Sequence, residues 1–230
     1  MNSAEVLATV DIVALRLHPE RGLELLLIRR AQAPFEGQWA LPGVLINGRC
    51  ADHGLDDAAL RALREKARVQ PAYMEQVATV GNAVRDPRGW SLSVFYLVLV
   101  APDTELAAGD LDFVPLDAVR GERFALPFDH TQLVQQACER LAGKSVYSAL
   151  PLHLLPERFT VAEALKAFEW SIGEEIQHSS LRGRLERMKA AGWVEDTGER
   201  HQPPMGRPQH VLRFTPQGDG AFVFDRSLLV

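Results

Sequence analysis

The 230-residue sequence has few of the residues that build disulfides, structural metal sites or membrane spans. Its two cysteines, Cys50 and Cys138, lie far apart and fit no CxxC or Cys/His spacing, which excludes a disulfide framework and a structural zinc site. No basic residue precedes Arg16, the wrong charge order for a secretory signal. The longest apolar run, 94–101, is far shorter than the roughly 18 residues that indicate a spanning helix. We therefore expect a cytoplasmic protein with no membrane partner.

The chain has fewer basic than acidic residues, 25 against 30, and the basic residues are unevenly distributed. The net charge of -5 is negative, which disfavours binding to the phosphates of a nucleic acid. The content of 47% hydrophobic and 24% charged residues is typical of a globular chain. Residues 1–175 carry a net charge of -7, whereas residues 176–214 carry seven basic and four acidic residues. The total therefore does not exclude a DNA-binding module near the C-terminal end.

The first part of the chain, residues 1–148, shows mixed strand and helix patterns. Apolar runs at 6–17 and 23–28 flank a turn with Pro and Gly and predict a hairpin, and further strands are expected at 44–46, 76–80 and 91–100. Helical spacing predicts helices at 55–67 and 129–144. This order indicates an α/β (α+β) domain with a mixed sheet.

The second part, residues 149–230, has a different pattern. Two prolines bound the segment 150–156, which reads as a linker. Thr160 and Glu163 form a capping box that opens a helix through Phe168, and a second helix at 177–191 ends at Gly192. Strands are expected at 193–196 and 210–214. Helix, helix, strand, loop, strand is the order of a winged helix-turn-helix.

Residues 38–43 together with 61–65 resemble the Nudix box, in which Gly, five residues, Glu and seven residues precede Arg-Glu-U-x-Glu-Glu-x-Gly-U, where U is aliphatic. Glutamates on one face of the box helix bind divalent metal ions that activate water. In this sequence Val44 stands at the box glycine, and the loop is three residues too long. Counting forward places Cys50 at the loop glutamate, and counting back places His53 there, so neither count gives a carboxylate.

The helical half of the box is also incomplete. Ala62 and Lys66 replace two of its three glutamates, Glu65 remains, and Arg68 stands at the terminal glycine. A single carboxylate beside a lysine is a poor site for a dication that requires several oxygen ligands. We therefore expect no bound metal, no catalytic residue, no cofactor and no hydrolysis.

Residues 79–91 indicate a nucleotide pocket. Arg85 and Arg88 stand on either side of a Pro-containing turn and could clamp phosphates, and Trp90 offers a flat face to a base or ribose. The same turn chemistry also fits a solvated hairpin loop. The surrounding sequence resembles the ADP-ribose-handling Nudix domains, and that resemblance implies a ligand pocket made of Arg30, Phe35, Trp39, Arg85, Asp86, Arg88 and Trp90.

The second helix of the C-terminal module carries the side chains expected at a DNA interface. Hydroxyls and cations of such a helix contact base edges and phosphates, and a guanidinium at the wing tip can enter the minor groove. The candidates are Ser179, Ser180, Arg182, Arg184, Arg187, Lys189 and Arg207. The alternative is a solvated helix face with pairs such as Arg182 with Glu186.

A Nudix domain with an incomplete box followed by a winged helix resembles the NrtR family of Nudix-related transcriptional regulators. The resemblance also covers Phe128-Asp129-His130. It implies a homodimeric repressor of NAD-metabolism genes that binds a double-stranded DNA operator and senses ADP-ribose or a relative of it. One alternative is a Nudix pyrophosphatase for ADP-ribose-like substrates, which depends on Glu65 with Asp57 or His53 as a further metal ligand. The other is an oligomeric scaffold in which both domains only pack.

Overall fold

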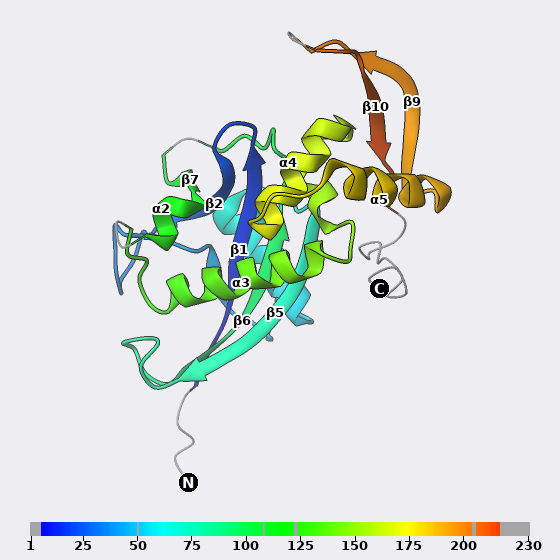
Figure 1. Cartoon of the computed structure of the whole chain (residues 1–230). Helices are drawn as coiled ribbons and strands as arrows, with labels where there is room; N and C mark the ends of the chain where they lie inside the picture. The colour runs from blue at the N-terminus through cyan, green and yellow to red at the C-terminus, as the bar shows by residue number, and fades with distance from the viewer. Residues whose placement is uncertain (1–5, 50, 108, 122–123, 204–205, 217–230) are drawn as a thin grey trace. The chain divides into compact units, whose positions relative to one another are not determined.

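The computed structural model describes residues 6–49, 51–107, 109–121, 124–203 and 206–216. The chain divides into two compact units, Met1–Glu139 and Arg140–Val230 (Figure 1). The division falls within one helix, α3 (His130–Ser145). The domain boundary that the sequence predicts, after residue 148, lies beyond the end of this helix.

The first unit is built on a mixed sheet with strand order β3-β2-β1-β6-β5, in which β4 also pairs with β1 and β7 with β2 (Figure 1). β1 and β6 run parallel, and the remaining pairs are antiparallel. The predicted hairpin and mixed sheet are confirmed. The strands are β1 (Leu7–His18), β2 (Gly22–Arg29), β3 (Trp39–Ala40), β4 (Gly43–Leu45), β5 (Tyr73–Asn82), β6 (Ser91–Leu99) and β7 (Leu111–Pro115).

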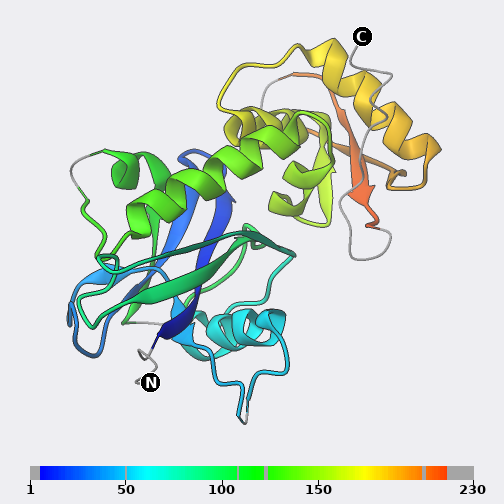
Figure 2. The same ribbon diagram turned by 90° about the horizontal axis from the view of Figure 1, so that it is seen from below.

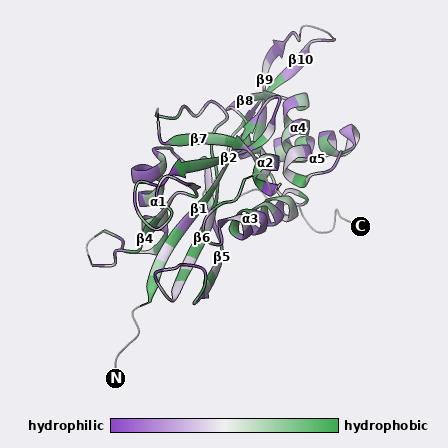
Figure 3. Ribbon diagram, turned by 90° about the vertical axis from the view of Figure 1, so that its left-hand side faces the viewer, coloured by the Kyte–Doolittle hydropathy of each residue, from purple (hydrophilic) through white to green (hydrophobic). Residues whose placement is uncertain are grey.

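Helices cover both faces of this sheet, with α1 (Leu55–Ala62) on one face and α3 on the other (Figure 2). Alternate side chains of the apolar strand β1, such as Val10 and Ile12, pack in one buried cluster with alanines of α1. In Figure 3 the neighbouring strands β2 and β7 are coloured as largely hydrophobic. Because alanine is small, α1 can lie close to the sheet. A π-helical turn, η1 (Leu63–Ala67), continues α1, and a short helix, α2 (Leu116–Arg120), follows β7.

The second unit contains the predicted winged helix. Helix α4 (Val161–Ile172) begins at Thr160, whose hydroxyl accepts from the Glu163 N–H at 3.3 Å while the Glu163 carboxylate accepts from the Thr160 N–H at 2.7 Å. This reciprocal pair confirms the capping box. Helix α5 (His178–Ala190) follows, and the strands β8 (Arg158–Thr160), β9 (Val194–His201) and β10 (Gln209–Phe214) form a sheet in the order β8-β10-β9.

The end of α5 and the segment before β8 show one prediction confirmed and one wrong. Gly192 adopts φ +76°, and the N–H groups of Gly192 and Trp193 donate to the carbonyls of Lys189 and Met188, so the predicted terminal glycine closes the helix in a Schellman motif. The predicted linker is instead a buried 3-10 helix, η2 (Leu150–Leu154). Proline is compatible with the first turn of a helix, and Pro151 occupies that place. Within the described part of the chain, no helix is both long and apolar enough to cross a bilayer.

Candidate functional site

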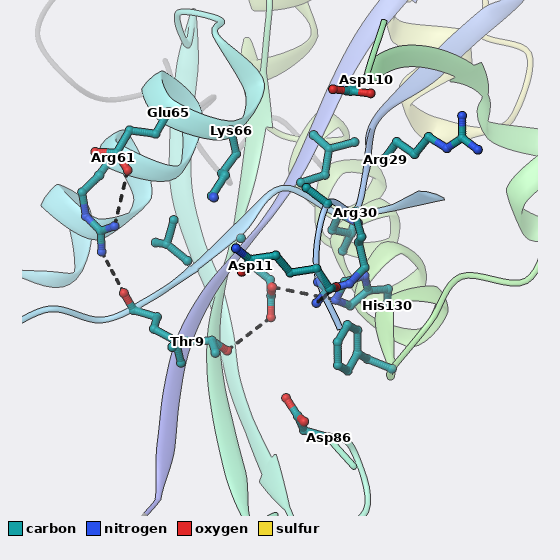
Figure 4. Close-up of a pocket in the computed structure, with 18 of the residues that line it drawn as sticks. Thr9, Asp11, Arg29, Arg30, Arg61, Glu65, Lys66, Asp86, Asp110 and His130 are labelled. Atoms are coloured by element: carbon teal, nitrogen blue, oxygen red, sulfur yellow. Dashed lines mark hydrogen bonds and ion pairs between the residues drawn. The ribbon is translucent and has the colours of Figure 1, made fainter. Parts of the chain in front are cut away.

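A pocket of about 700 Å³ opens in the first unit (Figure 4). Its walls come from β1, β2, β4, η1, the loop between β5 and β6, and the beginning of α3. This volume lies in the range of small-molecule sites. Although the surrounding unit is acidic, cations predominate in the pocket, which favours an anionic ligand. The lining includes the cations Arg29, Arg30, Arg61, Lys66, Arg68, Arg85 and Arg88 and the acids Asp11, Glu65, Asp86 and Asp110.

Arg85 lies at the pocket but is already bonded to carboxylates. Its Nε and Nη2 donate to the two carboxylate oxygens of Asp129 at 2.9 and 3.0 Å, and Nη2 lies 3.3 Å from Asp11 Oδ2. Burial opposes the charge, but the bonds to the two carboxylates outweigh it and raise the pKa of Arg85. The side chain is 3% exposed. Arg85 therefore lies in the pocket lining that the sequence predicts, but its guanidinium is paired with two carboxylates.

Arg88 and Asp86 also line the pocket and form a pair. Arg88 Nη2 donates to Asp86 Oδ2 at 2.7 Å and its Nε to Oδ1 at 3.0 Å. Burial of Asp86 opposes ionisation, yet the Arg88 bonds hold its pKa below the ordinary value. Trp90 is absent from the described residues that line the pocket. Its ring instead packs over Gly81, where a Cβ would come within 3.1 Å of Trp90 Cη2.

Arg30 lies among aromatic rings on another wall. Its guanidinium sits 4.9 Å from the centre of the Phe128 ring, and its Nε donates to the Pro34 carbonyl at 2.7 Å. Burial and the nearby Arg88 lower the pKa of Arg30, so an anion bound there would stabilise its charge. Phe35 meets Phe128 edge to face, with the ring centres 4.8 Å apart, and the described lining includes Phe128 but not Phe35. Trp39 lies in β3 and is likewise outside that lining.

His130 and Asp11 line the pocket, and the sequence did not single them out as site residues. His130 Nδ1 accepts from the Leu41 N–H at 3.1 Å, which places the ring proton on Nε2, 3.8 Å from Asp11 Oδ1. Burial lowers the pKa of His130, so the ring is neutral. Gly43 passes so close to Asp11 that a Cβ would overlap the Asp11 carboxylate. Only Phe128-Asp129-His130, quoted in the resemblance, pointed to this region.

The loop half of the box contains one carboxylate that pairs with the box helix, that of Asp52. Arg61 Nε and Nη2 donate to the two oxygens of Asp52 at 2.8 Å each, and Nη2 also donates to the Leu45 carbonyl at 2.8 Å. These bonds hold the pKa of Asp52 at about 2. The counts from the two ends of the box led to Cys50 and His53, but in the lengthened loop it is Asp52, one of the two residues between them, that pairs with Arg61. Cys50 itself lies outside the described residues. Arg68 adopts φ +56° at the place of the terminal box glycine.

The helical half of the box does not fit a divalent metal. Ala62 offers no ligand atom, Lys66 is a cation, and the Glu65 carboxylate lies 3.7 Å from both Arg61 and Arg64. Asp57, a further ligand in the enzyme alternative, accepts the N–H groups of His53 and Gly54 at 3.0 Å and caps α1. In the described ranges, no three His, Cys, Asp or Glu residues are grouped so that they could hold a metal ion.

The second unit presents one face of α5 to solvent. Leu181, Leu185 and Met188 are buried, while the exposed residues include Ser179, Ser180, Arg182 and Arg187. Lys189 pairs with Glu186 at 2.9 Å, in place of the Arg182–Glu186 pair considered from the sequence. Arg184 differs from its neighbours because it is half-buried, lies 5.9 Å from the Phe168 ring centre and donates to the Ser145 carbonyl at 3.3 Å. Burial lowers the pKa of Arg184.

The wing is the hairpin of β9 and β10, which extends away from α4 and α5 (Figure 1). Arg207 is exposed in its connecting loop beside Gly206, whose φ is +112°. The strand stems are held by ion pairs, Arg158 with Glu199 at 2.9 Å and Arg213 with Glu195 at 3.0 Å. The hairpin thus presents Arg207 at its tip, while Arg213 in β10 and Arg158 in the adjacent strand β8 are paired.

Comparison with known proteins accounts for both units. The NUDIX domain family matches residues 7–137, and the NrtR DNA-binding winged helix domain matches residues 151–214. The ADPR responsive transcriptional repressor NtrR of Acinetobacter baylyi is 36% identical over 226 residues, which cover 96% of this chain and 87% of the relative. The chain belongs to the NrtR family.

Solved structures agree with membership of the NrtR family. The crystal structure of Shewanella oneidensis NrtR with a 27mer DNA has a TM-score of 0.82 and 37% identity, covering 94% of this chain and 97% of that one. The NUDIX domain of the same NrtR, solved with ADP ribose, has a TM-score of 0.54 and 42% identity over 60% of this chain and 90% of its own length. An ADP-ribose pyrophosphatase of Methanocaldococcus jannaschii is 30% identical over 53% of this chain and 74% of its own.

Proposed function

We propose that this chain is a DNA-binding transcriptional repressor whose Nudix domain binds ADP-ribose as an effector and does not hydrolyse it. The observation that carries the proposal is a cation-rich pocket, with a box helix that does not fit a metal, in the same chain as a winged helix. Its family includes an ADPR responsive repressor, a structure with DNA and a structure with ADP ribose.

Binding of the effector would weaken binding of the operator. For this to happen, ADP-ribose must bind more tightly to the arrangement that does not fit DNA. A coupling free energy of about 1 to 3 kcal/mol would reduce DNA affinity about 5- to 150-fold. A homodimer would read two half-sites about 34 Å apart or a multiple of that distance. We further propose that the regulated genes belong to NAD metabolism and that the protein acts in the cytoplasm.

The DNA contacts would come from the exposed residues of α5 and from the wing. Ser179, Ser180 and Arg182 lie in its first two turns, where recognition helices meet base edges. Arg187, Lys189 and Arg207 would neutralise phosphates. Arg184 would act by holding α5 in place, because its guanidinium is directed to the Ser145 carbonyl and the Phe168 ring.

Fluorescence anisotropy tests this proposal. The full chain is titrated onto a labelled duplex from upstream of its own gene, with a scrambled duplex of the same length as the control, and ADP-ribose is then added. We expect tight binding to the upstream duplex alone and release on addition of ADP-ribose. Equal binding to both duplexes at 150 mM salt would refute sequence-specific recognition. An unchanged affinity with saturating ADP-ribose would refute the effector role.

Pyrophosphatase activity is the second candidate function, because Glu65 remains in the pocket and a pyrophosphatase is among the relatives. A phosphate-release assay on ADP-ribose with Mg²⁺ or Mn²⁺ distinguishes the two functions. We expect no turnover above the background. Turnover that disappears in Glu65→Gln would establish the enzyme and contradict the proposal that the box is catalytically inactive.

A further inference from the structure

Two cations of the pocket have no partner among the residues that the structure describes, and both come from the end of the box helix. Lys66 lies in η1, and Arg68 follows it; both line the pocket, and Lys66 points into it (Figure 4). Neither side chain makes a hydrogen bond or an ion pair with any residue that the structure describes. Both are exposed, so their charges are available to a ligand.

The remaining cations of the pocket are already engaged. Arg85 and Arg88 are bonded to carboxylates, as is Arg61. Arg29 and Arg30 donate to backbone carbonyls. Those carbonyls are neutral and leave the charges of Arg29 and Arg30 in place, whereas Arg85 and Arg88, at the turn between β5 and β6, are paired with carboxylates. A dianionic group that enters the pocket would therefore meet two further unpaired cations, Lys66 and Arg68, at the end of the box helix.

The position of Lys66 is significant because the box pattern has a glutamate there. In a hydrolase, that carboxylate helps to hold the dication that neutralises the substrate pyrophosphate. An ammonium at the same position supplies positive charge to the phosphates directly, and it repels a dication. Arg68, two residues later in a left-handed backbone conformation, adds a planar fork that suits phosphate oxygens.

We propose that Lys66 and Arg68 bind the diphosphate of the effector without a metal ion, so that the lysine ammonium replaces the divalent cation of a Nudix hydrolase. This inference rests on the proposed binding of ADP-ribose and adds which residues recognise its diphosphate and by what means. It also explains how the domain can bind such a ligand without cleaving it, since a lysine ammonium at this position cannot activate water as a bound dication does.

Isothermal titration calorimetry of the full chain with ADP-ribose tests the metal requirement, once in EDTA and once in excess MgCl2. We expect the two Kd values to agree within about twofold. A Kd that rises tenfold or more in EDTA would overturn the metal-free site while leaving the effector proposal intact. If no heat of binding is seen in either buffer, the effector proposal fails, and this inference fails with it.

Three variants then test the residues, and each is first shown to have the melting temperature of the parent chain. Lys66→Ala should raise the Kd about tenfold or more, as expected for loss of a charge-assisted hydrogen bond, and equally for ADP, which shares the diphosphate. Arg68→Ala should act in the same direction. Arg64→Ala is the matched control, because Arg64 lies on the same turn of helix but is not part of the pocket lining. If Lys66→Ala and Arg68→Ala both bind like Arg64→Ala, the proposal is wrong.

Lys66→Glu provides an independent test, because its affinity for ADP-ribose should depend on Mg²⁺ whereas that of the parent chain should not. It places a second carboxylate beside Glu65, and Mg²⁺ is commonly held by one or two carboxylates together with substrate phosphates. We expect this variant to bind ADP-ribose more weakly than the parent in EDTA and to recover affinity when Mg²⁺ is added. If Mg²⁺ has no effect on this variant, or if its affinity in EDTA equals that of the parent, Lys66 does not occupy the position of the metal.

Discussion

Replacement of Arg85 by alanine should destabilise the first unit strongly. The guanidinium is 3% exposed and joins Asp129, at the start of α3, to Asp11 on β1. Without it, the two aspartates, 13% and 10% exposed, face each other with no cation between them. Removing one partner of a buried ion pair costs about 3 to 5 kcal/mol. At about 2 to 4 °C per kcal/mol for a chain of this size, the melting temperature should fall by roughly 10 °C.

Circular dichroism and calorimetric melts of the full chain at pH 7 measure this effect. Arg64→Ala is the control, because its 67% exposed side chain lies 3.7 Å from Glu65, and exposed pairs contribute about 0 to 1 kcal/mol. Arg85→Lys should fall between the two, since an ammonium keeps the charge but cannot donate to both Asp129 oxygens from one planar group. A melting temperature for Arg85→Ala within 2 °C of the parent would refute the view that Arg85 joins β1 to α3.

Three further predictions follow from single contacts. The Asp52 carboxyl has a pKa of about 2 in the folded chain and an ordinary value of 3.8, so its stabilisation should be complete above about pH 4 and lost as the pH falls toward 2. The difference in urea unfolding free energy between the parent chain and Asp52→Asn should therefore vanish over that range, and a difference independent of pH would contradict the assigned pKa. Thr160→Ala should cost the winged helix about 1 kcal/mol in thermal melts by removing the N-cap of α4 without changing the Kd for ADP-ribose. In anisotropy titrations from 50 to 200 mM salt, Arg207→Ala should lower the slope of log Kd against log salt concentration for DNA binding by about 1. Arg184→Ala should leave that slope unchanged and lower the melting temperature. The reverse pattern would exchange the roles of the two arginines.

Elements with strong local signals could be predicted from the sequence. The β1–β2 hairpin and the Thr160 capping box depend on residues that are neighbours in the chain. Both interacting partners can therefore be read from one short stretch of sequence. The short elements β7 and α2 were missed because five residues are too few to show a period. The 150–156 segment was misread because proline favours the first turn of a helix as well as a linker, and only burial distinguishes the two.

The candidate site was less predictable, because its contacts cross long stretches of sequence. Arg85 meets Asp129 and Asp11 across 44 and 74 residues, and nothing near Arg85 in the sequence indicates that its charge is already neutralised. Asp52 was missed because the lengthened loop defeats counting from either end. The loss of helix carboxylates at Ala62 and Lys66, by contrast, could be read directly, since positions within a helix keep their spacing.

The division of the chain inside α3 determines how the two units could be separated. A fragment that ends at Glu139 would remove buried Leu141 from the helix, and a fragment that begins after Ser145 would lose the carbonyl that receives Arg184. The winged-helix unit therefore uses the last turn of a helix whose first residue, His130, lines the pocket of the first unit. Because α3 crosses the division, a cut within it removes residues that one unit or the other uses, and sensing and DNA binding should be measured together in the full chain.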